Sequence, residues 1–403
     1  MEKGKSSVSI FEFIALMAMM MSLPALSIDA MLPALTEVGS DLGVAQGNDN
    51  QLIISTLFLG LSIGQLIYGP LSDSIGRKPS VYTGMVIFVV GSVCSILTTS
   101  FEIMLLGRVL QGLGLSGPRI VCVAIIRDQF KGERMAQIMS FVMTVFIIVP
   151  TLAPVFGQAI LQFASWRAIF MTILFMGMVN LIWFTVRQEE TLKPEYRIPM
   201  RLSKFQYAFK EVLFHKASLL YTIAGGFVSS AFIGFLNSSQ QVFQFQYELG
   251  ESFPLYFAIS ALCVGGATFL NGKLVVKYGM YAMVKWASIA LAVTAGIYSF
   301  WLLSFDIAPT LFQYMGFLMT ALFSIGILFG NLNSLAMEPL GHVAGVGAAV
   351  VGSLSSLIAV PFGTLIGIAY DGTVLPIVLG FAIFGALTLG AILLSSRYRL
   401  SSS

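Results

Sequence analysis

Twelve apolar segments are the main feature of the sequence, and each can cross the ~30 Å hydrocarbon core of a bilayer as an α-helix. Of the 403 residues, 57% are hydrophobic and only 10% are charged, which is too little polar surface for a soluble protein. We therefore predict an all-α polytopic membrane protein. Its spans are expected at about 10–36, 51–71, 79–99, 101–126, 136–161, 167–187, 217–239, 254–276, 280–303, 310–336, 345–369 and 374–396.

The loops between these segments differ in charge. Loops after even-numbered segments are rich in bases, such as Arg77 and Lys131, whereas loops after odd-numbered segments carry acids, such as Glu37 and Asp41. By the positive-inside rule, the even-numbered loops and both termini are expected in the cytoplasm. The first apolar run is longer than that of a signal peptide, so we interpret it as an uncleaved membrane helix.

The longest polar stretch divides the chain into six spans and six spans. We expect a six-helix bundle at 1–187, a cytoplasmic linker at 188–216 and a second six-helix bundle at 217–403. The linker is basic, and part of it has amphipathic spacing that would lie on the inner membrane surface. A plain solvated linker fits the sequence equally well.

A short sequence recurs in the two halves. The glycine, leucine and glycine of residues 69–76 return in residues 272–279 at one constant offset of 203 residues. A duplicated six-helix unit in the same orientation is typical of secondary transporters, whose substrate site lies between the halves near the bilayer midplane. We therefore expect two pseudo-symmetric bundles around a central site.

Several classes of function lack support in the sequence. There is no GxxxxGK[ST] motif for nucleotide-driven transport and no Cys, His and acid cluster for a metal site or a nucleophile. Cys94, Cys122 and Cys263 lie inside apolar segments and are expected to be small buried side chains. The net charge of +3 gives no indication of nucleic-acid binding. We predict neither an enzyme nor a metal protein.

Residues 101–130 form an apolar helix that carries two arginines, Arg108 and Arg119. An arginine near the middle of a membrane helix costs at least ~2.5 kcal/mol, so it persists where it faces a cavity or a partner. The helix turns by about 1100° between the two, which places them on one face, within about 20° of each other. One face of this helix is therefore expected to border a water-filled cavity or to contact a polar partner.

Asp29 is the only acid well inside any apolar span. Asp29 and Arg108 each lie about seven residues, or ~10 Å, from the expected outer face. Burial favours the neutral acid and a nearby guanidinium favours the carboxylate, so a moving helix would shift the balance between the two forms. We expect Asp29 to carry a proton with Arg108 as its partner. A static pair that only orients the helices is the alternative.

The loop after the second span combines small residues with charge. Its motif residues are Gly69, Asp73, Gly76, Arg77 and Lys78. Asp73 could cap a neighbouring helix, and Arg77 could pair with Asp73 or with Asp128 at the end of the fourth span. We interpret the group as a latch that holds one conformation closed; a turn that carries cytoplasmic charges is the alternative.

Pro150, Pro154 and Gly157 remove hydrogen-bond donors and bulk from the fifth span. They predict a kink and close packing against a neighbouring helix. Whether the bend takes part in transport or has no dynamic role is left open by the sequence.

Several of these segments resemble signatures of the major facilitator superfamily. GPLSDSIGRK at 69–78 resembles its loop 2–3 motif, GRVLQG at 107–112, which contains Gln111 and Gly112, resembles its helix 4 motif, and VPTLAPVFGQ at 149–158 resembles the helix 5 motif of its antiporters. The Bcr/CflA branch of drug:proton antiporters is similar in SIDAMLPAL, IIRDQF, WRAIF, ETL and AYDGTVLP. The resemblance implies a monomer whose helix 5 motif seals the outer path between the halves.

Aromatic, apolar and amide side chains inside the spans are candidates for the wall of the cavity, because such surfaces suit uncharged amphiphilic molecules. The candidates are Met21, Phe141, Phe146, Phe232, Phe235, Asn237, Phe323, Phe329, Asn331 and Asn333. For Arg119 two roles are expected: a second cavity charge that tunes substrate choice, or a brace bonded to backbone carbonyls of the fifth span.

We predict an antiporter of the bacterial inner membrane that exports small amphiphilic drugs, similar to chloramphenicol or bicyclomycin, in exchange for protons. Its expected partners are drugs, protons and the lipid bilayer, and the proton gradient replaces any cofactor. A proton-coupled uptake symporter is an alternative that the helix 5 motif disfavours. A membrane enzyme or receptor without transport is a second alternative, which the repeat and the lack of catalytic residues disfavour.

Overall fold

The protein is described by a computed structural model that covers residues 9–200, 202–305 and 308–399. Within these residues the chain is helical and has no β-strand. The first half contains α1 (Ile10–Asp29), α2 (Leu35–Asp41), α3 (Leu52–Ile75), α4 (Arg77–Leu97), α5 (Phe101–Gln129), α6 (Gly132–Leu161) and α7 (Trp166–Arg187). After α8 (Leu202–Phe214), the second half contains α9 (Lys216–Gln240), α10 (Phe253–Tyr278), α11 (Met280–Phe305), α12 (Leu311–Met337), α13 (Ala344–Ile368) and α14 (Leu375–Arg399).

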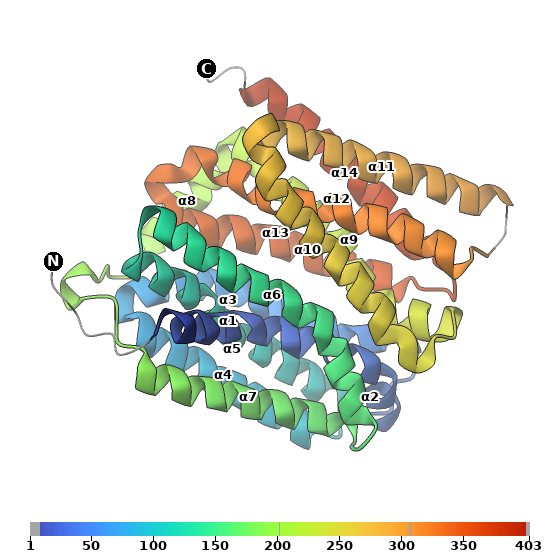
Figure 1. Ribbon diagram of the computed structural model, residues 1–403, viewed down its shortest axis with the longest axis horizontal. Helices are drawn as coiled ribbons and strands as arrows, with labels where there is room; N and C mark the ends of the chain where they lie inside the picture. The colour runs from blue at the N-terminus through green and yellow to red at the C-terminus, as the bar shows by residue number, and fades with distance from the viewer. Residues whose placement is uncertain (1–8, 201, 306–307, 400–403) are drawn as a thin grey trace.

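Twelve stretches of the described chain are helical, long and apolar enough to cross a membrane, so the predicted spans are confirmed. Helices α1 to α7 form one bundle and α9 to α14 form the other, with α8 between them in sequence (Figure 1). The main contacts between the bundles are α3 against α13 and α6 against α10. These four helices therefore form most of the interface between the halves.

The two ends of the paired bundles are named here by the segments that lie there. The linker end, on the left of Figure 1, holds the α3–α4 turn, the α5–α6 turn and α8. The first-loop end, opposite, holds α2 and residues 42–51, which connect the first two spans. These names imply no side of the membrane.

The repeated glycine of the two halves has one structural role. Gly76 has φ +112° between α3 and α4, and Gly279 has φ +79° between α10 and α11. Both values lie in the left-handed region, which glycine adopts without a steric penalty. The 203-residue offset thus places the same tight turn at corresponding positions of the two bundles.

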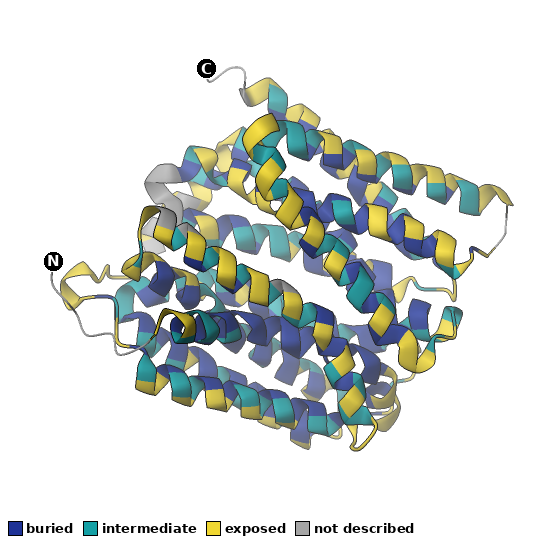
Figure 2. Ribbon diagram, in the orientation of Figure 1, coloured by how far each residue is buried: buried dark blue, intermediate teal, exposed yellow. Residues whose placement is uncertain are grey.

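Burial follows the arrangement expected for a protein surrounded by lipid. Buried residues gather along α1, while the outer sides of α7 and α11 carry exposed residues (Figure 2). Many exposed side chains are large and apolar, such as Val186 on α7 and Phe300 on α11. In water these faces would be unfavourable, whereas a bilayer covers them with acyl chains.

The linker helix α8 has an exposed apolar side. Tyr207, Phe209 and Phe214 are exposed on it, while α8 also contacts α9 and α13. This pattern agrees with the amphipathic spacing of the sequence. Its position on a membrane surface stays a prediction, as do the exact boundaries of the bundles and the linker.

Candidate functional site

Asp29 is the last residue of α1, where the first span is interrupted. A short 3₁₀ segment with Pro33 follows before α2 continues, because proline removes a donor from the helix. The side chain is 5% exposed. Among the described residues, none donates a hydrogen bond to its carboxyl group or forms an ion pair with it. Asp29 is therefore a buried acid without a partner.

The motif of the fifth span packs directly against this interruption. Gly157 on α6 lies so close to Ala30 that a Cβ there would overlap the Ala30 carbonyl oxygen. Pro150 and Pro154 lie inside α6, which continues through both. The close packing predicted for this motif is confirmed, and its neighbour is the residue that follows Asp29.

Arg108 on α5 is fully buried and binds backbone and neutral side chains. Its Nε donates to the Ile53 carbonyl oxygen over 2.9 Å, and its Nη2 donates to the Ser27 carbonyl oxygen over 3.0 Å. Its Nη1 donates to Ser27 Oγ over 3.3 Å and to Gln111 Oε1 over 2.9 Å. A guanidinium has five N–H donors in a planar fork, which suits several acceptors at once. Arg108 thus joins α1, α3 and α5.

The expected ion pair between Asp29 and Arg108 is not formed in this conformation. Arg108 uses its donors on the carbonyl oxygens of Ser27 and Ile53, which carry no signature in the sequence. The guanidinium nevertheless holds the backbone two residues before Asp29. Arg108 therefore affects Asp29 by positioning α1 and not by a direct contact.

The other residues of the helix 4 motif extend this network. Gln111, which accepts from Arg108, donates through Nε2 to Ser92 Oγ of α4 over 3.1 Å. Gly112 lies against the backbone of α3, where a Cβ would overlap the Leu57 carbonyl oxygen. The motif therefore permits close packing of α3 on α5 and connects Arg108 to α4.

Arg119 lies deeper toward the linker end of α5 than Arg108 and is half-buried. Within the described chain its guanidinium forms no hydrogen bond and no ion pair. The expected brace to carbonyl groups of the fifth span is therefore not observed. Arg119 remains a candidate for a charge that faces a substrate.

Arg77 forms the predicted ion pairs at the linker end, and the group of Arg77, Asp73 and Asp128 is called the latch below; that it holds one conformation closed stays a prediction. Its Nη1 lies 2.5 Å from Asp73 Oδ1, and its Nε lies 2.8 Å from Asp128 Oδ2. Nη1 also donates to Ser72 Oγ over 3.0 Å. The Arg77 side chain is 3% exposed, so its guanidinium is shielded from solvent in both ion pairs. The latch joins α3, α4 and the end of α5.

Glu190 in the linker was missed by the sequence reasoning, which proposed Asp73 as a helix cap. Its two carboxylate oxygens accept from the backbone N–H groups of Arg77 over 3.0 Å and Lys78 over 2.9 Å. An acid at a helix N-terminus satisfies free donors and opposes the positive end of the helix dipole. Thr191 donates to Asp128 over 3.0 Å, so the linker is bound to the latch.

Two further motif residues sit beside the latch. Lys78 donates through Nζ to the Thr185 carbonyl oxygen of α7 over 3.0 Å. Gly69 on α3 faces the second bundle, since a Cβ there would lie 3.7 Å from the Ala349 Cβ of α13. The motif therefore contacts both its own bundle and the opposite one.

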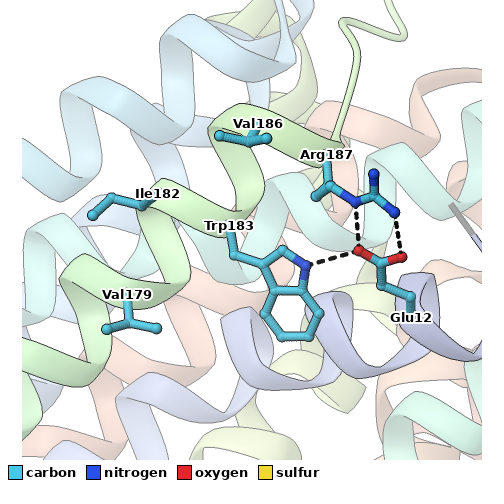
Figure 3. Close-up of a pocket in the computed structure, with 6 residues that line it drawn as sticks. All are labelled: Glu12, Val179, Ile182, Trp183, Val186 and Arg187. Carbon is cyan, nitrogen blue, oxygen red and sulfur yellow. Dashed lines mark hydrogen bonds and ion pairs between the residues drawn. The ribbon is translucent and has the colours of Figure 1, made fainter. Parts of the chain in front are cut away.

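Glu12 makes a separate contact at the linker end. Its carboxylate accepts from Arg187 Nε over 2.6 Å and from Arg187 Nη2 over 2.7 Å, and from Trp183 Nε1 over 3.1 Å (Figure 3). The three side chains border an open groove of about 580 Å³ whose other walls are apolar residues of α7, including the exposed Ile182. The contact ties α1 to α7 and lies away from the interface between the bundles.

Some of the cavity-wall candidates lie together in the second bundle. The Phe232 ring lies 5.5 Å from the Phe329 ring and 6.4 Å from the Phe235 ring. Asn331 is buried and donates to Asn271 Oδ1 over 2.7 Å. The structure does not gather the remaining candidates around a single cavity: Met21 is buried, Phe146 and Phe323 are half-buried, and Phe141 and Asn333 are exposed.

Asn237, the last of these candidates, belongs to a seam of amides between the bundles at the first-loop end. Its Nδ2 donates to Ser55 Oγ of α3 over 2.9 Å. Asn48 donates to the carbonyl oxygens of Ile368 over 2.8 Å and Tyr370 over 2.7 Å. Three glutamines complete the seam. Gln51 donates to Gln241, and Gln241 donates to Asn48. Gln240 donates to the Pro33 carbonyl oxygen.

The seam closes the interface between the bundles at the first-loop end. Its hydrogen bonds lie at the first-loop end, whereas the bond from Ser353 of α13 to the Ser62 carbonyl oxygen of α3, over 2.8 Å, lies near the middle of both helices. Opening the interface at the first-loop end would require all the amide bonds to break. The seam has little signature in the sequence, because Asn and Gln near span ends are also typical of solvated loops.

Comparisons with known proteins agree with this architecture. A family model described as Major Facilitator Superfamily matches residues 8–364. The bicyclomycin resistance protein homolog of Haemophilus influenzae is 29% identical over 372 residues, which cover 89% of each chain. The multidrug resistance protein MdtL of Salmonella heidelberg is 27% identical over 378 residues, which cover 92% of each chain.

Among solved structures, the POT family transporter PepTSo matches with a TM-score of 0.72 at 12% identity. The match covers 96% of this chain and 98% of the other. At this identity the likeness concerns the fold alone. The family model and the twelve apolar helices show that the chain is a multi-pass membrane transporter of the Major Facilitator Superfamily.

Proposed function

We propose that the protein is a proton-coupled exporter of small amphiphilic compounds of the chloramphenicol and bicyclomycin kind. The observation that carries the proposal is Asp29, a buried carboxyl without a partner at an interruption of the first span. The relatives named for bicyclomycin and multidrug resistance support drug export as the class of activity.

The environment of Asp29 supports a role in proton coupling. An isolated carboxylate is very costly to move from water into a protein interior, whereas the neutral acid is far less so. The conformation described here, with the first-loop end closed over a partnerless Asp29, therefore suits the protonated form. Separation of the seam would give Asp29 access to the first-loop side, where it would bind a proton before the end closes again.

The return half of the cycle requires the opposite coupling. When the linker end opens, a substrate that binds better to the deprotonated protein drives the proton off Asp29, and the loaded protein reopens at the first-loop end. Ligand and proton then shift the same two-state equilibrium in opposite directions through their different affinities for the two states. Arg108 takes part by fixing the backbone at Ser27, next to Asp29.

The proposal includes an orientation. We place the linker end, with its basic loops, in the cytoplasm of a bacterium and the first-loop end outside the inner membrane, following the positive-inside rule. The seam is then the outer gate, and the latch of Arg77, Asp73 and Asp128 belongs to the inner gate. We propose that one chain suffices for transport, since each gate is complete within it.

Inverted inner-membrane vesicles test both coupling and direction. Respiration acidifies their lumen, and an exporter uses that gradient to move drug into the lumen while protons leave. Addition of chloramphenicol is expected to dissipate the pH gradient and to load the lumen with drug in vesicles that contain the protein. Loss of drug from preloaded vesicles together with protons would instead indicate an uptake symporter. Absence of drug flux in either direction would contradict the proposal.

A further inference from the structure

The groove on the outer surface of the first bundle has walls that suit an acyl chain. It runs along α7, where Val179, Ile182 and Val186 line it, and all three side chains are exposed. The Trp183 side chain also lines it (Figure 3). Because α7 crosses the membrane, acyl chains of the bilayer cover its exposed apolar face. The groove therefore lies against phospholipid.

The groove has the length and direction of an acyl chain in one leaflet. Arg187, where α7 ends, follows Val179 by eight residues (187 − 179), which corresponds to a rise of about 12 Å along the helix. Half of the ~30 Å hydrocarbon core measures about 15 Å. Because α7 ends at the linker end, the groove extends from the surface of the leaflet on that side toward the middle of the bilayer.

The ion pair of Arg187 and Glu12 borders the groove at the linker end (Figure 3). The two side chains are 35% and 23% exposed, so both charges are accessible from outside the protein. Trp183 donates its indole N–H to Glu12 over 3.1 Å while its ring lines the groove. Tryptophan is typical of the membrane–water interface, because its ring is apolar and its N–H is polar. The charges therefore lie at the level of the lipid headgroups.

Both charges can bind a further group without losing their contact. Arg187 donates from Nε and Nη2 to Glu12, and a guanidinium has five N–H donors, which suits a phosphate beside a carboxylate. The Glu12 carboxylate accepts three hydrogen bonds from described residues and has about four acceptor sites, so it can accept one more. The acid and the base together carry no net charge. The pair therefore matches a headgroup that itself carries both signs.

We propose that this groove binds a phospholipid that has both a phosphate and a primary ammonium group, the chemistry of phosphatidylethanolamine. Its phosphate accepts from Arg187, its ammonium donates to Glu12, and one acyl chain lies along α7. A choline headgroup has no N–H to donate, and an anionic glycerol headgroup brings a negative charge to Glu12 without an ammonium. The bound lipid contacts α1 and α7 together. The site does not depend on the proposed export function.

Lipid binding to the purified full-length protein in detergent tests the site. Native mass spectrometry measures the binding of phosphatidylethanolamine, phosphatidylcholine and phosphatidylglycerol, each with the same acyl chains and each added alone. We expect wild type to bind phosphatidylethanolamine at least about fivefold more tightly than either other lipid, as for one added hydrogen bond between charged groups at an accessible site. Equal affinity for phosphatidylcholine or phosphatidylglycerol would overturn the proposal.

Glu12→Gln tests the contact with the headgroup. Glutamine keeps the size and one acceptor oxygen but has no charge for an ammonium. The preference for phosphatidylethanolamine over phosphatidylcholine is therefore expected to fall below about twofold. Binding of phosphatidylglycerol should rise, because Glu12 no longer repels it. A preference that persists in a folded Glu12→Gln protein would refute the headgroup contact.

Asp41→Asn is the matched control. At the other end of α7, Asp41 accepts from Arg167 over 2.5 Å and from Trp166 over 3.1 Å, which is the same set of side chains outside the groove. We expect this variant to keep the lipid preference of wild type. If Asp41→Asn lowers the preference as much as Glu12→Gln does, the preference does not belong to this groove.

Ile182→Gln tests the acyl part of the site and serves if Glu12→Gln does not fold. Ile182 is 60% exposed, so the fold should tolerate its replacement. An amide in the groove is expected to weaken the binding of phosphatidylethanolamine and phosphatidylcholine about threefold each, because the acyl chain loses apolar contact. Unchanged binding of both lipids would show that no acyl chain lies along α7.

Discussion

Arg108 donates to the carbonyl oxygen of Ser27 over 3.0 Å and so holds the backbone of α1 two residues before Asp29. The same guanidinium binds the Ile53 carbonyl oxygen and Gln111. The only acid deep in a span and the buried base are thus connected through main chain. This relationship separates the role of the arginine, which positions α1, from the role of the acid, which binds the proton.

Replacement of Arg108 by lysine tests its positioning role. Lysine keeps the charge but lacks the planar fork, so buried carbonyl oxygens on α1 and α3 lose their donor. We expect Arg108→Lys to lower the free energy of unfolding by about 2–4 kcal/mol, measured as thermal stability in detergent. Arg119→Lys is the control and should change stability by less than about 0.5 kcal/mol, because Arg119 has no partner in the described chain. Equal effects of the two substitutions would contradict the positioning role.

The contact between Gly157 and Ala30 predicts a steric effect on transport. A valine at 157 would collide with the Ala30 carbonyl oxygen and push α6 away from the interruption after Asp29. We expect Gly157→Val to reduce drug transport at least about tenfold and to destabilise the protein by about 1–3 kcal/mol. Gly296→Ala on α11, where an added Cβ meets nothing within 4 Å, should transport normally. Normal transport by Gly157→Val would show that the close packing is dispensable.

The latch predicts a stability difference between a buried and an exposed ion pair. Arg77→Ala would remove the base that Asp73 and Asp128 share, and we expect the free energy of unfolding to fall by about 1–3 kcal/mol, measured by thermal unfolding. Faster hydrogen exchange at residues 69–78 should accompany it. Glu195→Gln breaks the exposed Lys193–Glu195 pair, 4.0 Å apart, and should cost less than about 0.5 kcal/mol. If Arg77→Ala costs no more stability than Glu195→Gln, the group is a turn that carries charges and not a latch.

Arg119 predicts a change in selectivity. A partnerless guanidinium that faces a substrate would attract anionic compounds and contribute little to the binding of neutral ones. We expect Arg119→Ala to lower the transport of an anionic drug relative to chloramphenicol by about fivefold in proteoliposomes. If transport of both falls equally, Arg119 has no part in substrate choice.

The sequence predicted the parts of the fold that depend on local patterns. Apolar length identified the twelve spans, and the repeated glycine identified corresponding positions of the two bundles, which the structure shows to be the turns at Gly76 and Gly279. The pairing of Arg77 with Asp73 and Asp128 also followed from charge and spacing. These features can be predicted from the sequence because each depends on side chains whose chemistry permits few other structures.

Other features depended on partners that have no sequence signal. Arg108 binds backbone carbonyl oxygens of Ser27 and Ile53, which every residue type offers, so an ion pair with Asp29 was the only partner that the sequence suggested. The cap from Glu190 and the bond between Asn48 and Tyr370 join segments far apart in the chain. Only the folded arrangement brings such groups together.

Proton-driven transport by Asp29→Asn tests the central claim most directly. Asparagine has nearly the same shape and cannot gain or lose a proton, so the fold should persist while coupling is lost. In proteoliposomes with an imposed pH gradient, wild type is expected to accumulate chloramphenicol against its concentration gradient, and Asp29→Asn should only equilibrate it. Undiminished accumulation by a folded Asp29→Asn protein would show that the proton travels elsewhere.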